Sequence, residues 1–321
     1  MDRKNYVYPD LSKAYQISQF YSPICRNGYV ELASGKKIRI HQIHMEEDAG
    51  KLVHKGGDVY VDYNRGGVPL LEIVSEPDIS SSEEAREYVE KLQMIMRYIG
   101  VSDCKMQEGS MRCDVNVSVK PTGSQKFGTR TEIKNMNSIT FMTKAIEYER
   151  SRHIDLIESG KKVIQQTLRY VEETNSTESM RSKEDAQDYR YFPDPDLVAI
   201  HLSAEYIENI RKNLPELPES RRARYMSEFG LSEKDSNLLT ASKYLSILFE
   251  KTEIICKNAK AVANWLLSDI SRILNEKEME ADQIPFTAEQ LAKMITLIDK
   301  GTISSAIAKK VLEEMFENPE M

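Results

Sequence analysis

The chain of 321 residues has few of the features that mark several common protein classes. Its four cysteines, at positions 25, 104, 113 and 256, are widely spaced, so neither a zinc site nor a disulfide framework is indicated. No apolar run approaches the ~20 residues that a membrane-spanning helix needs, and the first residues lack the apolar segment of a signal peptide. We therefore expect a cytoplasmic protein with reduced thiols and no membrane partner.

The sequence also lacks the short motifs of several enzyme classes. It contains no Gly-x-Ser-x-Gly nucleophile elbow, no phosphate-binding loop and no Gly-x-Gly-x-x-Gly at a strand-to-helix turn. A net charge of −7 argues against a protein that coats nucleic acid over its whole surface, but it does not exclude tRNA. If this chain handles a nucleotide, we expect it to use carboxylates and Mg²⁺ on a sheet.

Residues 62–78 are the most informative stretch, because they set charged groups around a Gly-Gly turn that opens a strand. Arg65 precedes the two glycines, and the following run at 70–74 is apolar except for Glu72. A core strand does not need these ionisable groups, so this stretch indicates a functional site.

The periodicity of apolar residues changes along the chain in a way that predicts an α+β fold. Up to about residue 200, short strands mix with a few helices, whereas the remainder is nearly all helical. Period-2 alternation predicts strands at 39–44 and 112–119, and residues 172–187 have no apolar periodicity, so they are predicted to form a mobile connection. A capping-box pattern at 80–83 predicts the start of a helix that runs to residue 99. Helical spacing, a further capping box and a Pro-rich joint at 214–219 predict helices at 139–158, 219–229, 232–251, 257–276, 287–299 and 303–316.

A dense group of ionisable residues ends the first predicted strand. Ideal alternation places His44, Glu46 and Asp48 on one face and Glu47 on the other, but a bulge would reverse the choice. The residues alone therefore do not decide which glutamate faces a ligand. An exposed acidic strand end is the competing interpretation.

Later strands carry further polar faces. Arg112 and Asp114 share the polar face of the strand at 112–119, and Glu132 and Lys134 share a face of another. Carboxylates for a metal ion beside cations for phosphate are what phosphoryl transfer requires, because its catalysis is mainly positioning and charge stabilisation. A surface ion pair is the alternative for Glu132 and Lys134.

Five separated motifs, in order, carry a resemblance to a known family. This chain resembles the B subunit of the glutamyl/aspartyl-tRNA amidotransferase, the GatB family, over nearly its whole length. The motifs are Tyr6-Val7-Tyr8-Pro9-Asp10, His44-Met45-Glu46-Glu47-Asp48-Ala49-Gly50-Lys51, the stretch at 62–78, Glu132-Ile133-Lys134-Asn135-Met136-Asn137-Ser138 and Asp188-Tyr189-Arg190-Tyr191-Phe192-Pro193.

The resemblance implies a reaction, its cofactors and its partners. Proteins of the GatB family bind misacylated Glu-tRNA(Gln) or Asp-tRNA(Asn), activate the side-chain carboxylate with ATP and Mg²⁺, and amidate it with ammonia. The ammonia comes from the glutaminase, or A-type, partner, while the small C-type partner holds the pair together. The enzyme class would be an ATP-dependent carbon–nitrogen ligase with glutamine as amido donor. The catalytic sheet domain of the family is similar in fold to glutamine synthetase.

The resemblance also implies roles for residues of this chain. It favours Glu47 over Glu46 as the glutamate that faces the site. For Arg190, phosphate binding competes with stacking of the guanidinium on Tyr189 or Tyr191. The implied roles are catalytic for Glu46, Glu47 and Lys134, cofactor-binding for Arg65, Arg112, Glu132 and Arg190, and metal-binding for His44, Glu47 and Asp114.

The chain departs from the family pattern at both ends. Family members begin several dozen residues earlier, with a strand that carries a Gly-Leu-Glu-Val-His-Val-Glu-Leu motif, so we expect a chain truncated at both ends. The expected domains are a catalytic α+β domain at 1–213 that lacks its first strands, and a helical domain at 214–321 that runs into a truncated YqeY-like tail. A catalytically inactive fragment that only binds tRNA and partners is the alternative function.

Overall fold

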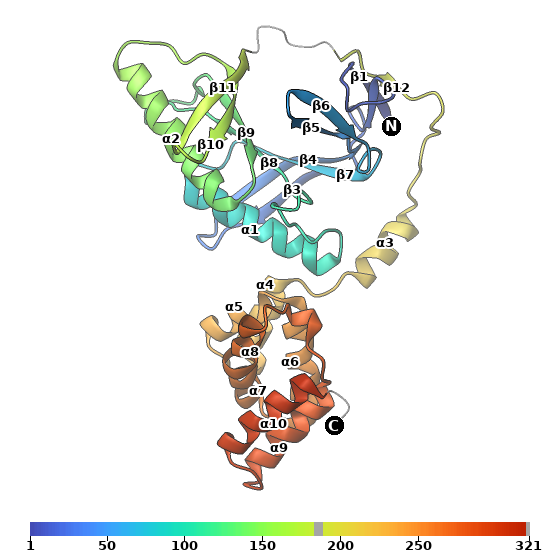
Figure 1. Ribbon diagram of the computed structural model, residues 1–321, viewed down its shortest axis with the longest axis vertical. Helices are drawn as coiled ribbons and strands as arrows, with labels where there is room; N and C mark the ends of the chain where they lie inside the picture. The colour runs from blue at the N-terminus through green and yellow to red at the C-terminus, as the bar shows by residue number, and fades with distance from the viewer. Residues whose placement is uncertain (183–188, 319–321) are drawn as a thin grey trace. The chain divides into compact units, whose positions relative to one another are not determined.

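The computed structural model describes residues 1–182 and 189–318, which form two compact units (Figure 1). The first unit consists of Met1–Leu92 and Cys104–Glu208, and the second joins Gln93–Asp103 to the residues from Asn209 onward. The first unit mixes strands with helices, and the second is helical. The predicted α+β fold class is therefore confirmed.

The larger sheet of the first unit is built around a long strand, β4. Its strand order is β12 (Phe192–Pro193), β1 (Asp2–Asn5), β2 (Tyr15–Ser18), β4 (Lys37–Glu47) and β3 (Cys25–Glu31), with β7 (Pro69–Ser75) paired to β4. Each of these pairings is antiparallel. Along β4, Ile38 and Ile40 are buried while Arg39 and His41 are exposed, which is the predicted alternation.

A second sheet has the order β11 (Ser176–Ser182), β10 (Gln166–Val171), β9 (Thr131–Met136) and β8 (Cys113–Val117). Strands β9 and β10 are parallel, and helix α2 (Ile139–Glu158) lies between them in the chain, as a parallel crossover requires. The helix begins at its cap, Ser138, whose side chain accepts a hydrogen bond from the Phe141 amide. The predicted helix at 139–158 is confirmed.

The mobile connection predicted at 172–187 is wrong for residues 176–182, whereas residues 172–175 form the turn between β10 and β11. Residues 176–182 form strand β11, which pairs antiparallel with β10, and residues 183–187 lie outside the described residues. The sequence gives no strand signal here, because β11 is an edge strand and its central residues are exposed. Such a strand needs no apolar alternation to pair through its backbone.

Helix α1 (Ser82–Ile99) packs its apolar stripe against both sheets of the first unit. Ala85, Tyr88, Val89 and Leu92 share one core with residues from β4, β9 and α2. The helix ends at Gly100, where φ is +74°, a conformation that favours glycine. The helix predicted to open at 80–83 and run to residue 99 is confirmed, and its packing leaves the opposite sheet faces to polar side chains.

A separate hairpin follows β4. Strands β5 (Lys51–Lys55) and β6 (Asp58–Asp62) pair antiparallel and are joined by Gly56 and Gly57, with φ of +62° and +90°. Two consecutive positive φ values define the type I′ turn of a two-residue hairpin.

The helical unit has a core of its own, formed chiefly by its later helices. Its helices are α3 (Ala204–Asn213, which begins in the first unit), α4 (Pro218–Glu228), α5 (Glu233–Thr240), α6 (Lys243–Cys256), α7 (Ala259–Trp265), a π-helical turn η1 (Leu266–Ile270), α8 (Ser271–Glu276), a short 3₁₀ turn η2 (Ala281–Gln283), α9 (Ala288–Asp299) and α10 (Ser305–Glu317). Trp265 is half-buried against this core, as expected. Among the described residues, no helix is long and apolar enough to cross a membrane.

One predicted helix of this unit divides into two. The helix predicted at 232–251 is broken after Thr240, because Ser242 caps a new helix by accepting a hydrogen bond from the Leu245 amide. Helix α3 was not predicted, and none of its described residues is buried. An exposed helix lacks the contrast between a buried and a solvated face that periodicity reports.

The close approach at Gly50 yields a stability prediction. A Cβ atom at Gly50 would lie 2.9 Å from the carbonyl oxygen of Asp62 and 2.9 Å from the ring of Tyr63. We expect Gly50→Ala to lower the free energy of unfolding by about 1–3 kcal/mol, measured by urea denaturation. In the control Gly28→Ala, the nearest atoms lie 3.8 Å away, and equal destabilisation by both changes would contradict the prediction.

Candidate active site

The site begins where the end of β4 lies beside the start of β7. The antiparallel register places His44 opposite Glu72 and Glu47 opposite Pro69. The turn before β7 is fixed to β4 because the amide of Gly67 donates to the Asp48 carbonyl and the amide of Asp48 donates to the Val68 carbonyl. The charged stretch at 62–78 therefore runs back along β4 and places Glu72 beside His44.

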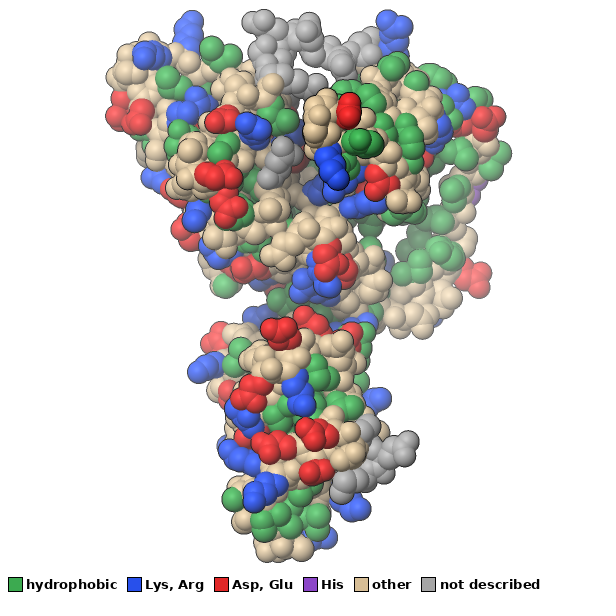
Figure 2. Space-filling model, in the orientation of Figure 1, with side chains coloured by type: hydrophobic (Ala, Val, Ile, Leu, Met, Phe, Trp, Pro, Cys, Tyr) green, Lys and Arg blue, Asp and Glu red, His purple; other side chains and the backbone are tan. Residues whose placement is uncertain are grey.

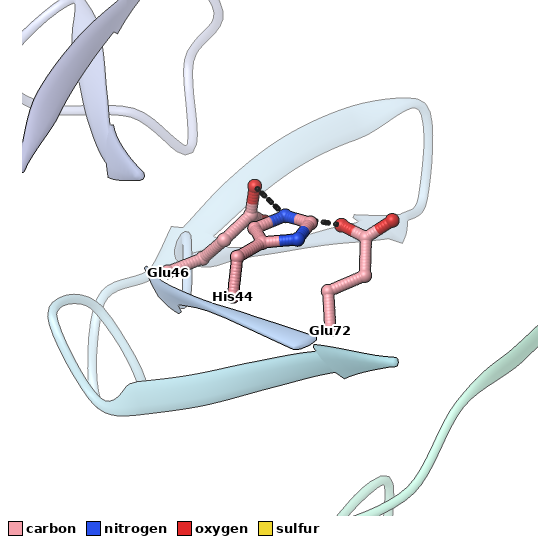
Figure 3. A group of neighbouring side chains, drawn as sticks. All are labelled: His44, Glu46 and Glu72. Carbon is pink, nitrogen blue, oxygen red and sulfur yellow. Dashed lines mark hydrogen bonds and ion pairs between the residues drawn. The ribbon is translucent and has the colours of Figure 1, made fainter. Parts of the chain in front are cut away.

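His44, Glu46 and Glu72 converge at this position (Figure 3). Nε2 of His44 lies 3.3 Å from Oε1 of Glu46 and 3.3 Å from Oε2 of Glu72. A metal ion needs several ligand atoms close together. Within residues 1–182 and 189–318, His44, Glu46 and Glu72 meet this condition, because one ligand atom from each lies within 4.8 Å of the other two. The group joins two carboxylates and one imidazole.

Hydrogen bonds within this group shift the pKa values of His44 and Glu46 in opposite directions. Hydrogen bonds to Glu46 and Glu72 raise the pKa of His44 to about 9, against the opposing effect of its burial. Burial raises the pKa of Glu46, but the hydrogen bond from His44 and the nearby charge of Lys4 outweigh it, so that its pKa is lowered. At neutral pH the group therefore holds a proton on His44 between two carboxylates.

Strand β2 supports Glu46 from the other side. Oε1 of Glu46 accepts a hydrogen bond of 3.0 Å from the Ser18 hydroxyl, and its Oε2 accepts one of 3.2 Å from the Gln16 amide. Ser18 is opposite Glu46 in the β2–β4 register. Because the carboxylate is 11% exposed and is held by three partners, its orientation is fixed before any ligand arrives.

Aromatic rings from distant parts of the sequence border this group. Tyr191 stacks on Phe20 with ring centroids 4.2 Å apart, and Tyr6 contacts Tyr189 edge to face at 5.8 Å. Burial and the Glu46 charge raise the pKa of Tyr191 to about 12, with Glu72 also contributing. These rings form an aromatic wall beside the group, and the Tyr191 phenol stays protonated at neutral pH.

The two ends of the first unit meet at this wall. Strand β1 pairs with β12, and Nε of Arg3 lies 2.7 Å from Oδ2 of Asp194. Arg190 sits beside this pairing with φ of +45°, and its carbonyl accepts a hydrogen bond from the Asn5 amide group. Nζ of Lys4 lies over the Tyr189 ring, 5.0 Å from the ring centroid. The motif residue Asp188 lies outside the described residues.

Glu47 points to a different set of partners from Glu46. Its Oε1 lies 2.5 Å from Nζ of Lys13 and accepts a hydrogen bond of 2.9 Å from the Ile17 amide. The structure therefore does not assemble the predicted metal set of His44, Glu47 and Asp114. It brings Glu46 to His44 instead, as ideal alternation without a bulge would place it.

Asp48 organises the two predicted phosphate-binding arginines. Its carboxylate is 5% exposed, and Oδ2 lies 2.9 Å from Nη2 of Arg65 and 3.8 Å from Nη2 of Arg112. Arg65 also donates to the Gly109 carbonyl at 3.0 Å. Two guanidinium groups share one buried carboxylate, so this corner carries a surplus positive charge.

Asp114, Glu132 and Lys134 meet on the polar face of the second sheet. Nζ of Lys134 lies 3.0 Å from Oδ2 of Asp114 and 3.5 Å from Oε1 of Glu132, and the Thr167 hydroxyl donates to Glu132 at 3.1 Å. Burial lowers the pKa of Lys134, but both carboxylates outweigh it and hold its pKa above the ordinary value. The predicted sharing of faces is confirmed, while the catalytic and ligand roles of these residues stay predictions.

Two residues that shape the site carried no assigned role in the sequence interpretation. Glu72 was visible as the one charge in an apolar strand, but its partner depends on the β4–β7 register. Asp48 was placed on a strand face, but its burial under Arg65 and Arg112 depends on the turn at 62–68. For Glu72 the available signal was a lone carboxylate in an apolar strand, whereas no comparable signal marked Asp48.

The basic cluster at 221–224 does not form a free cationic surface. Arg221 is buried, and Arg224 forms ion pairs with Glu216 and Glu250. Figure 2 shows acidic and basic side chains mixed over the visible face of each unit. Arg221 and Arg224 are therefore paired with carboxylates of the same unit.

Comparison with known proteins identifies the family. The GatB/GatE catalytic domain matches residues 1–208, and the GatB domain matches residues 247–321. The B subunit of an aspartyl/glutamyl-tRNA(Asn/Gln) amidotransferase from a Thermoanaerobacter species is 54% identical over 98% of this chain and 67% of its own length. Proteins of the same name from Lachnospira eligens and Clostridium botulinum are 53% and 52% identical, over 98% and 99% of this chain and 68% of their own lengths. The chain therefore belongs to the GatB family.

Proposed function

We propose that this chain is the amidating subunit of a tRNA-dependent amidotransferase. ATP transfers its γ-phosphoryl group to the side-chain carboxylate of Glu-tRNA(Gln) or Asp-tRNA(Asn), which gives an acyl phosphate and ADP. Ammonia then attacks the carbonyl carbon, phosphate leaves, and an amide forms. The observation that carries this proposal is family membership over nearly the whole chain, together with the carboxylate–histidine group on β4 and β7.

A divalent cation fits the group formed by His44, Glu46 and Glu72. Two carboxylates supply the hard oxygen ligands that Mg²⁺ prefers, and the imidazole nitrogen would join them once it has lost its proton. A bound Mg²⁺ neutralises charge on phosphate oxygens during phosphoryl transfer. Glu47 and Asp114 remain predicted ligands from the family resemblance, outside this group.

The cationic residues of the site are proposed to hold phosphate. Arg65 and Arg112 share Asp48 and offer surplus positive charge to an anion, and Arg112 is 70% exposed. Lys134, held between Asp114 and Glu132, would stabilise the negative charge that develops during transfer. Arg190 is proposed to contact phosphate beside the aromatic wall.

The wider assembly follows from the family. We propose a glutamine-synthetase-like fold for the catalytic domain at 1–213, a tRNA-contacting role for the helical domain at 214–321, and cytoplasmic assembly with the A-type and C-type partners of the amidotransferase. The A-type partner, a glutaminase, would supply ammonia by hydrolysing glutamine. The enzyme class would be an ATP-dependent carbon–nitrogen ligase.

The test is amidation of Glu-tRNA with ATP, Mg²⁺ and ammonium chloride, with this chain in complex with its partner subunits. Free ammonium bypasses the glutaminase, so the assay reports this chain's own reaction. We expect Gln-tRNA to form, with loss of product when either ATP or Mg²⁺ is omitted. Gln-tRNA formation without ATP consumption would rule out the proposed activation step.

A further inference from the structure

Two loops meet at one end of the second sheet, whose strands β8, β9 and β10 are labelled in Figure 1. Residues 118–130 join β8 to β9, and residues 159–165 join α2 to β10. The first loop ends at the start of β9 and the second at the start of β10. These two strands start side by side because they are parallel neighbours, with Glu132 opposite Thr167. We call the two loops the basic loop pair.

The basic loop pair carries five positive charges and no Asp or Glu. Its cations are Lys120, Lys126 and Arg130 in the first loop and Lys161 and Lys162 in the second. All five are exposed, and in the part of the chain that the structure describes none of them pairs with a carboxylate. The whole chain has the opposite balance, with 44 Lys and Arg against 51 Asp and Glu. Even when Asp155 and Glu158 at the end of α2 are counted, positive charge exceeds negative charge here.

The first loop has a defined shape. Its neck is closed where Gly128 passes Val119, since a Cβ atom at Gly128 would overlap the Val119 carbonyl oxygen. Within the loop, the Ser124 amide donates to the Pro121 carbonyl at 3.0 Å, and the Ser124 hydroxyl accepts from the Lys126 amide at 3.2 Å. A loop that is ordered in advance loses less conformational entropy when it binds a ligand.

An aromatic ring lies among the cations of the first loop. Nζ of Lys120 lies 4.5 Å from the ring centroid of Phe127, and the Phe127 side chain is still 52% exposed. In the second loop, Ile164 is 68% exposed. Exposed cations interleaved with apolar side chains are typical of RNA-binding surfaces, where cations contact phosphates and apolar groups contact sugars or bases.

The basic loop pair lies apart from the groups proposed to hold the nucleotide. Arg112, which contacts Asp48, precedes β8, and Ser118 follows it. Six residues of extended chain span about 20 Å, so the first loop begins about that far along the strand from Arg112. A ligand that contacts both places must be long and must carry negative charge along its length, as an RNA backbone does.

We propose that the basic loop pair is a docking surface for the phosphate backbone of RNA. This inference rests on the proposed function, which names an RNA substrate but places its backbone only on the helical domain. The cations of the two loops would contact phosphates at a distance from the reacting end, and Phe127 would contact a sugar or base beside them. Contacts of this kind position an RNA without reading its sequence.

The test measures the affinity of an unacylated tRNA(Gln) transcript for the complex that contains the full chain, by fluorescence anisotropy over a series of KCl concentrations. Lys161→Gln/Lys162→Gln should weaken binding by about threefold or more at about 0.1 M KCl. The slope of log Kd against the logarithm of the KCl concentration should fall by about 1.5, because each lost phosphate contact removes about 0.7–0.9 from it. Lys120→Gln/Lys126→Gln should have the same two effects.

A matched control removes two exposed cations elsewhere on the same sheet and helix. Lys144 lies in the first half of α2 and Arg169 in the second half of β10, away from the basic loop pair. Lys144→Gln/Arg169→Gln makes the same change in net charge and should leave both the affinity and the salt slope unchanged. Equal losses in this control and in the loop variants would show an effect of net charge alone and would overturn the proposal.

An uncharged substitution adds a second readout. Phe127→Leu should weaken tRNA binding while leaving the salt slope unchanged, because it removes an aromatic contact and no charge. A merely structural role of the first loop would lower the free energy of unfolding without this separation of affinity from slope. Vesicles of phosphatidylglycerol are the competing polyanion. If the lysine variants lose affinity for these vesicles but keep their affinity for tRNA, the surface belongs to a membrane contact and the RNA proposal is wrong.

Steady-state kinetics separate this inference from the proposed function. In amidation of Glu-tRNA with ammonium chloride, Lys161→Gln/Lys162→Gln should raise the KM for Glu-tRNA and leave kcat unchanged. An unchanged KM together with an unchanged tRNA affinity overturns this inference alone. Binding of tRNA that depends on the two loops, in a complex that forms no Gln-tRNA, overturns the proposed activity alone.

Discussion

Glu46→Gln should reduce amidation of Glu-tRNA by at least about a hundredfold while leaving tRNA affinity unchanged. The substitution keeps the shape of the side chain but removes one of the two negative charges that face His44. Glu46 is one of the two carboxylates proposed to hold the cation that neutralises charge on the phosphate oxygens, so the substitution weakens cation binding and the charge stabilisation that depends on it. The measurement is the rate of Gln-tRNA formation with ammonium chloride, beside Mn²⁺ affinity determined by titration.

Glu47→Gln is the matched comparison, because the two glutamates are adjacent and differ in their partners. It should disturb the contacts with Lys13 and the Ile17 amide, and so lower activity, yet leave Mn²⁺ affinity of the group at His44 unchanged. The opposite pattern, in which Glu47→Gln abolishes cation binding and Glu46→Gln preserves it, would move the metal site to the other face of β4. That result would agree with the ligand implied by the family resemblance.

Glu149→Gln should lower the free energy of unfolding by about 3–5 kcal/mol at neutral pH, because a buried ion pair loses one partner. Glu149 is fully buried on α2, and Arg152 donates to its two oxygens at 2.7 Å each. The Thr131 hydroxyl of β9 and the Thr177 hydroxyl of β11 donate to the same carboxylate, at 2.8 and 2.5 Å. His153 completes the network at 3.2 Å.

The difference in the free energy of unfolding between the native protein and Glu149→Gln should depend on pH in one direction. Burial raises the pKa of Glu149, but hydrogen bonds from Arg152, His153 and the two threonines outweigh it, and its pKa is lowered overall. A carboxylate with a lowered pKa stabilises the fold above its ordinary pKa of about 4.3, and that contribution is lost as pH falls towards the folded value. The gap between the native protein and Glu149→Gln in urea denaturation should therefore narrow on acidification.

A neighbouring surface pair provides the control for this stability prediction. Glu147 also lies on α2, and it pairs with Arg150 at an exposed position. Glu147→Gln should change the free energy of unfolding by less than about 1 kcal/mol at any pH. If both substitutions destabilised the protein equally, the buried network would not be the cause.

Local patterns predicted the helices well where burial follows the helical period. Residues 139–158 form α2 as predicted, since Ser138 caps the helix and Ser159 with Gly160 follows it. Such patterns failed for β11 and α3, whose described side chains are largely exposed. Periodicity records the contrast between buried and solvated faces, so elements without that contrast leave no signal.

The sequence by itself determined the family, the α+β class, the faces of β4 and β8, and most of the residues that bear charge at the site. These follow from motif order and from side-chain periods of 2 and 3.6, which are properties of the local chain. Only the tertiary structure decided that Glu46 rather than Glu47 joins His44 and Glu72, that Asp48 holds Arg65 and Arg112, and that Tyr189 and Tyr191 border the group. These arrangements depend on strand register and on pairings between residues up to about 190 positions apart in the chain, and no local pattern records them.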